Sequence, residues 1–553
     1  MKSLRLLIAL FIPLLTAAPA KAEPPGGQSR VTLTPSGEQL IAAWSLDKPV
    51  DSVSLSRWVA ADERDRLWHL DDDGWVFDGA VLSREDGEPF NKFRMSISES
   101  DRFYDRRYVP AIRIGTSGWA VLPEAFNVAD HPVLISFEGG EESDVLLAGA
   151  GLVPRDEAIP ADVGGFFYFG PPEHVVDGAA TVIAGPDVPD WLRDKFVADT
   201  QSISRTLTQR FEEAPPAPPT LIVTYRDQAG SGFKGSSLGR FITLHVRGYS
   251  LDPENENFMQ RMTGLALHET VHVWNGQLYS SRENSEQSWL HEGAAEYISL
   301  RAWMDPDQLR GRMEEMINGC QRALLRRPLT STAYGSWGRT PYDCGALVQL
   351  IAEAASMQAG NGDILAIWKN VFERAGEGHV FDTAMFRAAA SEAGGEMYTS
   401  RFARLEAGMN ADDWESFLKG LADIGIDIEV RASDAPPQSD HRLAQLALAA
   451  VQRDYCNDQV SLHGLEDHYW IDISDRCGGH IPGNPRLRTL NGIDLIEAPG
   501  EAYGEIRRAC AAGETVTLGR LDGEELKPLS CGRWMSGLTS PVAVTALPEF
   551  PEF

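Results

Sequence analysis

The sequence contains almost no long apolar runs. Apart from an apolar segment at residues 6–15, no stretch approaches the roughly 18 apolar residues of a membrane-spanning helix. That segment follows a positively charged start and precedes Ala20-Lys21-Ala22, a small-residue cleavage motif, so residues 1–22 are typical of a secretory signal. We therefore expect cleavage after Ala22, no integral membrane segment afterwards, and a periplasmic or secreted protein. An uncleaved membrane anchor is the less favoured alternative.

Cationic residues are also scarce. The chain has 50 Lys and Arg against 80 Asp and Glu, which gives a net charge of −30. A surface this acidic repels polyanions and argues against nucleic acid or an anionic membrane as a partner. It mildly favours neutral or basic substrates, although a high net charge more often serves solubility. The composition leaves the oligomeric state open.

Cysteine is rare and never closely paired. The chain has six cysteines, and none shows the short spacing of a thiolate zinc site. An even number of cysteines in an oxidising compartment favours disulfides, although sequence alone allows many pairings. Neighbour order along the chain suggests Cys320–Cys344, Cys456–Cys477 and Cys510–Cys531. Free buried thiols are the alternative.

The sequence has no repeat of solenoid period and no low-complexity block beyond its linkers. Short apolar runs between turn signals dominate the first part, helical periodicity dominates the middle, and a proline-rich linker at 435–440 precedes the last part. We expect a multidomain α+β protein. Its parts are a signal at 1–22, a β-rich N-terminal domain at 23–185, a domain at 186–310 that carries the motif described next, a helical region at 311–434 and a small α/β module at 441–553.

His268-Glu269-Thr270-Val271-His272 is the most informative motif. At helical pitch, residues four apart lie about 40° apart around the axis and roughly 6 Å apart along it, so both histidines can bind one ion. Glu269, beside the first histidine, can reach a water on that ion. A structural histidine pair is the alternative, but the helix-compatible residues before the motif and the helix stop Asn275-Gly276 after it favour a metal site.

A second helical pattern, at 286–304, carries two glutamates. A catalytic zinc takes three protein ligands, and two histidines with one glutamate form a known set, so we expect Glu292 as the third ligand of Zn2+. Glu296 lies one turn further on the same face and could accept the second ring N–H of a zinc histidine; a solvated helix glutamate is the alternative. His291 could contact substrate, but adjacent residues point about 100° apart, so we expect a spectator.

These segments resemble known peptidases. Residues 268–275, HETVHVWN, resemble the HExxHxWN pattern of the glycyl aminopeptidase family, which belongs to the gluzincin zinc metallopeptidases. Residues 289–293, WLHEG, resemble the WLxEG segment of the aminopeptidase N and leukotriene A4 hydrolase family. Residues 342–347 are similar to the YxKGA segment of that second family, whose tyrosine hydroxyl stabilises the tetrahedral intermediate. The resemblance therefore implies this role for Tyr342, with Tyr334 as a rival.

The resemblance also implies an architecture and an activity. It implies a thermolysin-like catalytic domain with a helical C-terminal half, a PDZ-like module at the end, Zn2+ as cofactor, Glu269 as general base and a peptide or protein as substrate. The related aminopeptidases hold the free amine of the substrate with a glutamate on an edge strand. Residues 232–241 occupy the matching place, contain no carboxylate and carry Lys234 and Arg240. The choice between endopeptidase and aminopeptidase therefore stays open.

Two hypotheses belong to other classes of protein. The chain could be a catalytically inactive, peptidase-like scaffold whose C-terminal module docks an extended peptide by strand addition. The intact Glu269 weighs against this hypothesis, since a lost base is the simplest mark of an inactive relative. A zinc hydrolase that acts on a non-peptide bond is the other hypothesis, and no residue selects it.

Overall fold

The computed structural model describes residues 28–553 with gaps. The gaps are residues 60, 100–108, 129–131, 142–143, 149–150, 156, 163, 227–231, 248–255, 283–287, 325–326, 332–338, 431–440, 457–460, 466, 473–476, 478 and 539–540. The predicted signal, the predicted linker at 435–440 and Tyr334 lie outside the described residues. The chain divides into two compact units, Met1–Pro172 and Glu173–Phe553.

The first unit is built mainly from strands, as the sequence predicts. Buried residues alternate with more exposed ones along the first half of β2 (Gln39–Val50), as expected for a strand with one face on a core. Trp44 of this strand stacks on Phe93, with ring centroids 4.7 Å apart. Trp44 and Phe93 therefore belong to the apolar core of this unit.

The described part of this unit contains three sheets, one short α-helix, α1 (Ala61–Leu67), and a 3-10 turn at Pro123–Phe126. The six-stranded sheet has the order β13 (Ile159–Pro160), β10 (Leu134–Phe137), β1 (Arg30–Ser36), β2, β7 (Phe90–Ser98), β4 (Trp68–Leu70). The five-stranded sheet has the order β12 (Gly151–Val153), β11 (Val145–Ala148), β14 (Phe167–Gly170), β9 (Gly118–Val121), β8 (Ala111–Ile114). The three-stranded sheet has the order β3 (Ser52–Ser54), β6 (Val81–Arg84), β5 (Trp75–Phe77).

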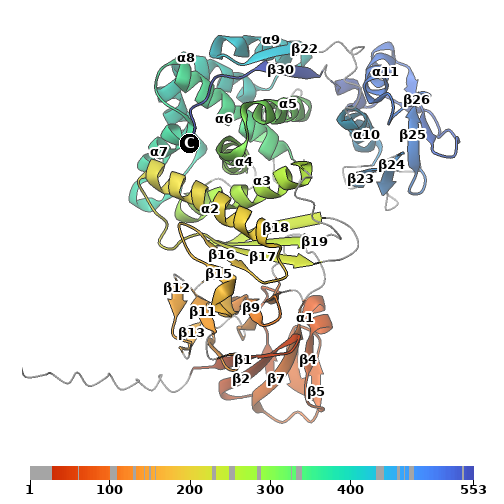
Figure 1. Cartoon of the computed structure of the whole chain (residues 1–553). Coiled ribbons are helices and arrows are strands. Elements are labelled where there is room, and N and C mark those ends of the chain that lie inside the picture. The colour runs from red at the N-terminus through yellow and green to blue at the C-terminus, as the bar shows by residue number, and fades with distance from the viewer. Residues whose placement is uncertain are drawn as a thin grey trace, which may run out of the picture. The chain divides into compact units, whose positions relative to one another are not determined.

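The second unit starts with a five-stranded sheet. Its order is β15 (Val175–Val176), β16 (Thr181–Ala184), β17 (Thr220–Arg226), β19 (Phe241–Arg247), β18 (Gly232–Leu238). β16, β17 and β19 are parallel, and β18 runs antiparallel at one edge. Helices α2 (Asp190–Phe211) and α3 (Glu256–His272) pack on one face, where Leu192, Phe196 and Met262 join the apolar side chains of the strands (Figure 1). This packing fixes the helix that carries the histidine motif.

The boundary between the two units differs from the predicted one. The sequence pattern assigns β15 and β16 to the N-terminal domain at 23–185, but Val182 of β16 pairs with Leu221 of β17. All four residues of β16 are buried. An apolar, β-branched run predicts a strand without revealing its partner sheet. The structure places the boundary after Pro172.

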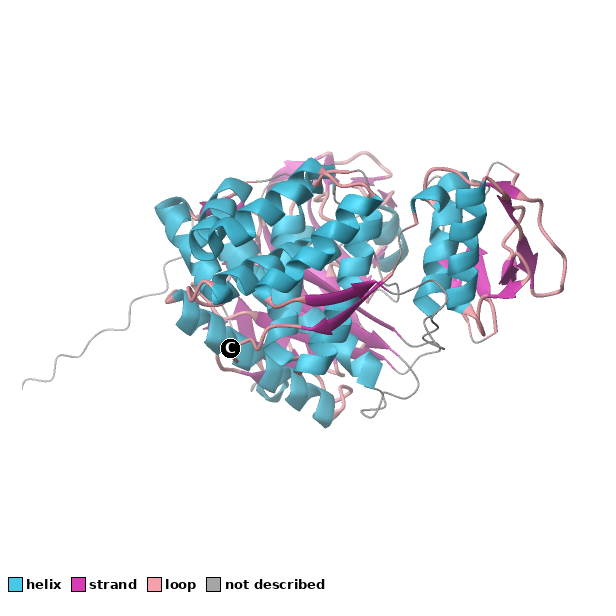
Figure 2. Ribbon diagram, turned by 90° about the horizontal axis from the view of Figure 1, so that it is seen from above, coloured by secondary structure: helices cyan, strands magenta, loops and turns pink. Residues whose placement is uncertain are grey.

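A helical region follows the sheet, as predicted. Seen from above, these helices lie over the strands (Figure 2). They are α4 (Ser288–Trp303), α5 (Pro306–Ala323), α6 (Thr340–Gln358), α7 (Ile364–Ala375), α8 (Thr383–Ala407) and α9 (Ala411–Lys419). A parallel pair of short strands, β20 (Ser280–Ser281) and β21 (Val380–Phe381), connects the end of the motif region to the start of α8.

Helices α4 and α6 cross in very close contact. A Cβ atom at Gly293 would lie 2.2 Å from the Cα of Gly345, and one at Gly345 would lie 2.0 Å from the carbonyl oxygen of Trp289. Only glycine on both helices allows this approach. The disulfide Cys320–Cys344 ties α5 to α6 beside the same crossing. Glu292, the residue before Gly293, is therefore held firmly in place.

The C-terminal module has its own core and two of the disulfides. Helices α10 (His441–Tyr455) and α11 (Pro499–Ala512) pack on a sheet formed by β23 (Ser461–Gly464), β24 (Tyr469–Asp472), β25 (Arg486–Leu490), β26 (Ile493–Asp494) and β28 (Leu518–Arg520). β27 (Thr515–Val516) pairs with β29 (Leu529–Ser530). Cys456–Cys477 and Cys510–Cys531 are both formed. With Cys320–Cys344, the disulfide pairing predicted from neighbour order is confirmed.

The chain returns to the helical region after the module. β30 (Val542–Ala546) pairs with β22 (Asp427–Val430) rather than with the sheet of the module. The guanidinium of Arg301 in α4 lies 4.5 Å from the ring centroid of Phe550 and 4.7 Å from that of Phe553. The last residues of the chain thus pack on the region that contains the histidine motif. No helix in the described part of the chain is both long and apolar enough to cross a bilayer.

Candidate metal centre

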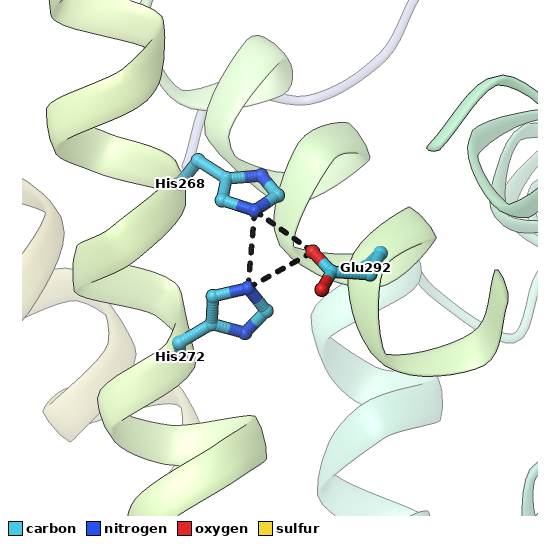
Figure 3. A group of neighbouring side chains, drawn as sticks. All are labelled: His268, His272 and Glu292. Carbon is cyan, nitrogen blue, oxygen red and sulfur yellow. Dashed lines mark hydrogen bonds and ion pairs between the residues drawn. The ribbon is translucent and has the colours of Figure 1, made fainter. Parts of the chain in front are cut away.

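The two histidines of the motif lie on the last turns of α3. His268 and His272 are buried, with 5% and 6% of their surface exposed. They project from one side of the helix, toward α4 (Figure 3). Leu267 and Val271, the residues just before them, are buried in the large apolar core of the helical region. The apolar positions therefore lock the rotation of the helix and point both imidazoles inward.

Glu292 of α4 completes the group. Its Oε2 atom lies 3.2 Å from Nε2 of His268 and 3.3 Å from Nε2 of His272. The two Nε2 atoms lie 3.0 Å apart. These three side chains form the one group of three or more candidate metal ligands found among the described residues (Figure 3). The structure thus brings together the three residues that the sequence singles out as zinc ligands.

The donor set fits a tetrahedral zinc ion. Two ligands that lie about 2.0–2.1 Å from such an ion are about 3.3 Å from each other, close to the three separations observed. The two imidazole nitrogens and the carboxylate oxygen can each direct a lone pair into the centre of the cluster, where these lone pairs would repel one another. A shared proton or a cation at that point removes the repulsion. Burial alone would raise the pKa of Glu292, but its hydrogen bonds with the two histidines hold that pKa well below its usual value. The carboxylate is therefore charged and suited to a cation.

Asn275 orients the second histidine. Its Oδ1 lies 2.9 Å from Nδ1 of His272, so this ring nitrogen donates a hydrogen bond and Nε2 keeps its lone pair toward the cluster. Asn275 lies in a single π-helical turn, Val273–Leu278, and departs from helical geometry at φ −91° and ψ 19°. Its Nδ2 donates to the carbonyl of His291 on α4. The sequence analysis gives Asn275 as a helix stop and as the last residue of the HExxHxWN resemblance, without a role toward His272. Its place three residues after His272 is the signal that could have revealed this role.

His291 supports the same histidine from the other side. Its ring stacks on that of His272, with centroids 4.1 Å apart and an angle of 21° between the planes. Its Nδ1 lies 2.8 Å from the carbonyl oxygen of Asn275. Burial lowers the pKa of His291 to about 3, so the ring is neutral. His291 thus packs against a candidate ligand, which the sequence reasoning did not foresee.

Glu296 lies behind the first histidine. Its Oε2 is 3.4 Å from Nδ1 of His268, an ion-pair distance. Its other oxygen accepts hydrogen bonds from Arg312 at 3.0 Å and from Arg339 at 2.5 Å. Burial lowers the pKa of His268, but the carboxylates of Glu292 and Glu296 outweigh burial and raise that pKa to about 10. Because Arg312 and Arg339 both donate to Glu296, its carboxylate is held behind the His268 ring.

Of the two predicted catalytic residues, Tyr342 lies beside the cluster, and Glu269 follows His268 directly in the chain. Glu269 is half-buried and has no hydrogen-bond or ion-pair partner among the described residues. Tyr342, near the start of α6, has its ring centroid 5.6 Å from that of His268. The guanidinium of Arg339 lies 5.4 Å from the centroid of the Tyr342 ring. Tyr334, the rival, lies outside the described residues.

An edge strand runs beside the motif helix. β18 pairs with β19 on one side, and no described strand pairs with its other side. A Cβ atom at Gly235 of β18 would lie 2.9 Å from the Leu265 side chain of α3, so strand and helix are in contact. An unpaired strand edge can hydrogen-bond the backbone of an extended peptide. The arrangement therefore combines a cluster of candidate metal ligands with an open strand edge beside the helix that carries two of them.

Comparison with solved structures defines the fold. An aminopeptidase N family protein from Idiomarina loihiensis superposes with a TM-score of 0.55 at 13% identity, covering 93% of this chain and 98% of that chain. An M1 zinc metallopeptidase from Deinococcus radiodurans gives a TM-score of 0.37 at 14% identity, covering 69% of this chain and 93% of that chain. No protein-family model and no curated protein matches the sequence. The chain thus shares its fold with the Idiomarina protein, and the mixed architecture expected from the sequence is confirmed at this coarse level.

Proposed function

We propose that the chain is an exported zinc metallopeptidase that hydrolyses peptide bonds. The observation that carries the proposal is the convergence of His268, His272 and Glu292 within 3.0–3.3 Å, with Glu269 adjacent to the first of them. Two histidines and a glutamate form a known ligand set of catalytic zinc, which leaves one position for water or substrate. The fold shared with an aminopeptidase N family protein supports a peptidase over other zinc hydrolases.

The side chains divide the chemistry between them. Zinc, when bound, polarises the scissile carbonyl and lowers the pKa of a coordinated water to about 7. Glu269 accepts the proton of the attacking water and passes it to the leaving amine. The Tyr342 hydroxyl donates a hydrogen bond to the oxyanion that develops on the carbonyl; the loss of such a donor costs about 3–4 kcal/mol. Glu296 and Asn275 keep the two imidazole rings in the orientation that presents Nε2.

The proposal also covers the peptidase family, the type of C-terminal module, the mode of cleavage and export. The glycyl aminopeptidase resemblance rests on residues 268–275, and the PDZ-like assignment rests on the pattern of the module at 441–553. β18 carries Lys234, and no carboxylate occurs in residues 232–241. Without a carboxylate there to pair with a substrate ammonium group, we propose an endopeptidase rather than an aminopeptidase. Export is supported by the signal-like residues 1–22 and by the three disulfides.

The test is the Glu269→Gln variant, which keeps the shape of the side chain and removes the base. We expect hydrolysis of an internally quenched peptide with a blocked N-terminus to fall at least about a hundredfold, while bound zinc is unchanged. Full activity in this variant would contradict the mechanism. Turnover of free-amine peptides with none of blocked ones would reject the endopeptidase version. Tight peptide binding without any turnover by the zinc-loaded wild type would favour the scaffold alternative.

A further inference from the structure

Arg339 stands at the beginning of α6, three residues before Tyr342. It is the N-cap residue of this helix, and its carbonyl oxygen accepts a hydrogen bond from the backbone N–H of Asp343 at 2.9 Å. Side chains three residues apart on a helix are neighbours on its surface. The guanidinium of Arg339 accordingly lies 5.4 Å from the centroid of the Tyr342 ring, within the range of a cation–π contact. The start of α6 thus places a cation against the tyrosine proposed to stabilise the oxyanion.

The same guanidinium reaches a second helix. Its Nη2 atom donates to Oε1 of Glu296 on α4 at 2.5 Å. The other oxygen of Glu296 lies 3.4 Å from Nδ1 of His268. Nε of Arg339 also lies 3.6 Å from Oδ1 of Asp343, so a carboxylate of α6 helps to hold the guanidinium. Arg339 therefore connects the start of α6 with the glutamate behind the first candidate ligand.

These contacts form a closed ring of four side chains, Arg339, Glu296, His268 and Tyr342. Arg339 contacts Glu296 and Tyr342. Those two side chains both contact His268, since the centroid of its ring lies 5.6 Å from that of Tyr342. The members come from α3, α4 and the start of α6. A displacement of Arg339 thus reaches the candidate metal ligand along both sides of the ring.

Arg312 offers a comparison within the same cluster. It donates to Oε1 of Glu296 at 3.0 Å, the oxygen that Arg339 also contacts. Arg312 reaches this carboxylate from α5, whereas Arg339 reaches it from the helix that carries Tyr342. Both arginines therefore support Glu296, and Arg339 in addition links that support to the tyrosine.

A cation against a phenol ring affects the hydroxyl in two ways. Attraction between the positive charge and the ring orders the side chain. The same charge favours the O–H group as a hydrogen-bond donor to an anion, because it stabilises negative charge that develops nearby. Position matters most, since a shift of about 1 Å in a group that acts on the transition state can cost about a hundredfold in rate.

Resting on the peptidase function and the role of Tyr342 proposed above, we propose that Arg339 is a positioning residue. It holds Glu296 behind His268 and orders the Tyr342 side chain for the oxyanion. The orientation of a metal ligand and the place of the oxyanion donor are then fixed by one guanidinium.

The test compares Arg339→Gln with the wild type, both saturated with Zn2+, on an internally quenched peptide with a blocked N-terminus. We expect kcat to fall at least about tenfold while KM stays within about twofold, because the lost interaction is made in the transition state. Competition with a chelator should show zinc binding weakened by at least about tenfold. Arg339→Lys keeps the cation and should restore part of both losses. An unchanged kcat, a loss confined to KM, or equal losses in the Gln and Lys variants overturns the proposal.

Folding of these variants is checked by thermal melting. The Arg339 side chain is 53% exposed, so we expect the substitutions to leave the fold intact. If Arg339→Gln melts early, Arg339→Met carries the comparison, because it keeps most of the length of the side chain and removes the charge. Its expected losses in kcat and zinc affinity are those given for Arg339→Gln, and the same contrary results overturn the proposal.

Arg312→Gln separates the two contacts of Arg339. It removes the other donor to Glu296, so it should weaken zinc binding while lowering kcat less than Arg339→Gln does. A loss of kcat in Arg312→Gln as large as that in Arg339→Gln would place the whole effect in Glu296 and overturn the proposed link to Tyr342.

Arg387 of α8 is the matched control. Its guanidinium lies 5.6 Å from the ring centroid of Phe402 and 3.0 Å from Glu406, so it repeats the pairing of one arginine with an aromatic ring and a glutamate. None of these residues belongs to the metal cluster. Arg387→Gln should leave kcat and zinc affinity unchanged. Equal losses in Arg387→Gln and Arg339→Gln would reflect the general loss of such a pair and overturn the proposal.

A binding measurement separates this proposal from the peptidase proposal. A phosphinic peptide presents a tetrahedral phosphorus oxyanion that is not hydrolysed, so its Kd for the zinc-loaded protein reports the oxyanion donor without turnover. In a cycle of Arg339→Gln and Tyr342→Phe, we expect the double variant to bind about as weakly as the weaker single variant. If the two effects multiply instead, Arg339 does not act through Tyr342 and the positioning proposal fails, even where the wild type cleaves peptides.

The opposite outcome is equally distinct. If the wild type binds the phosphinic peptide and shows the non-additive cycle but cleaves no peptide, the peptidase proposal fails and the positioning role of Arg339 stands. A zinc-loaded wild type that does not bind the phosphinic peptide overturns both.

Discussion

Nδ1 of His272 lies 2.9 Å from Oδ1 of Asn275, so an amide one turn further along the chain fixes the orientation of the imidazole. The same amide donates to the carbonyl of His291, which joins the end of α3 to the start of α4. One side chain thus holds a candidate ligand and both helices that supply the cluster. A metal site depends as much on such partners as on its ligands.

The first prediction concerns this amide. Asn275→Ala removes the acceptor for Nδ1 of His272 and should weaken zinc binding by about 10–100-fold, measured by competition with a chelator. Asn410→Ala is the matched control, since Asn410 caps α9 through the N–H of Asp413. It should lower stability by about 1 kcal/mol without changing zinc affinity. Equal zinc affinity in Asn275→Ala and wild type would show that Asn275 does not position the ring.

The second prediction concerns the crossing of α4 and α6. Gly293→Ala places a Cβ 2.2 Å from the backbone of Gly345, so the helices must separate and Glu292 must move. We expect a loss of about 1–3 kcal/mol in unfolding free energy, together with weaker zinc binding. Gly311→Ala in α5 is the control, because its new methyl group meets nothing within 4 Å. It should stabilise the protein by up to about 1 kcal/mol, and a similar gain in Gly293→Ala would refute the close crossing.

Much of this architecture could be predicted from local patterns in the sequence. Spacing alone put His268 and His272 on one helical face, and the second helical pattern supplied Glu292. Neighbour order was enough for the disulfides. These features depend on residues close in sequence, where helical and strand periods are informative.

The sequence patterns did not reveal which segments far apart in the chain contact one another. Nothing in β16 identifies β17 as its neighbour, so the boundary after Pro172 could not be predicted from the sequence. Nothing in residues 542–546 reveals that they pair with β22 instead of the module. The hydrogen bonds from Arg312 and Arg339 to Glu296 join three separate helical segments. Such pairings are decided by packing of the whole chain, which periodicity along one segment does not encode.

The third prediction concerns a buried ion pair on α4, the helix that carries Glu292. Arg301 donates to Glu353 at 3.1 Å, and the Glu353 side chain is fully buried. Glu353→Leu leaves a buried guanidinium without its carboxylate, so we expect a loss of about 3–5 kcal/mol in thermal or urea unfolding. Glu415→Gln breaks an exposed pair with Lys419 and should cost less than about 1 kcal/mol. Similar small losses in both variants would mean that the Arg301–Glu353 pair contributes little.

The fourth prediction concerns pH. Desolvation, with the nearby cations Arg226 and Lys234, lowers the pKa of His245 from 6.5 to about 4. The unfolded chain therefore binds more protons than the folded one between pH 4 and 6.5, so stability rises as pH increases through that window. Nδ1 of His245 lies 2.8 Å from the hydroxyl of Thr224, and His245→Gln can keep a hydrogen bond there. Urea unfolding at pH 5 and pH 7, with chelator throughout, should show a smaller pH dependence in the variant. An unchanged dependence would exclude His245 as its source.

The most direct test of the central claim is the zinc content of the purified protein. Metal analysis of the wild type dialysed against Zn2+ should give one tightly bound zinc per chain. Glu292→Gln and His268→Ala should lose that ion, whereas Glu269→Gln should retain it, because only the first two remove a ligand. A wild type that binds no zinc, or a Glu292→Gln variant that binds zinc as tightly as the wild type, would contradict the account.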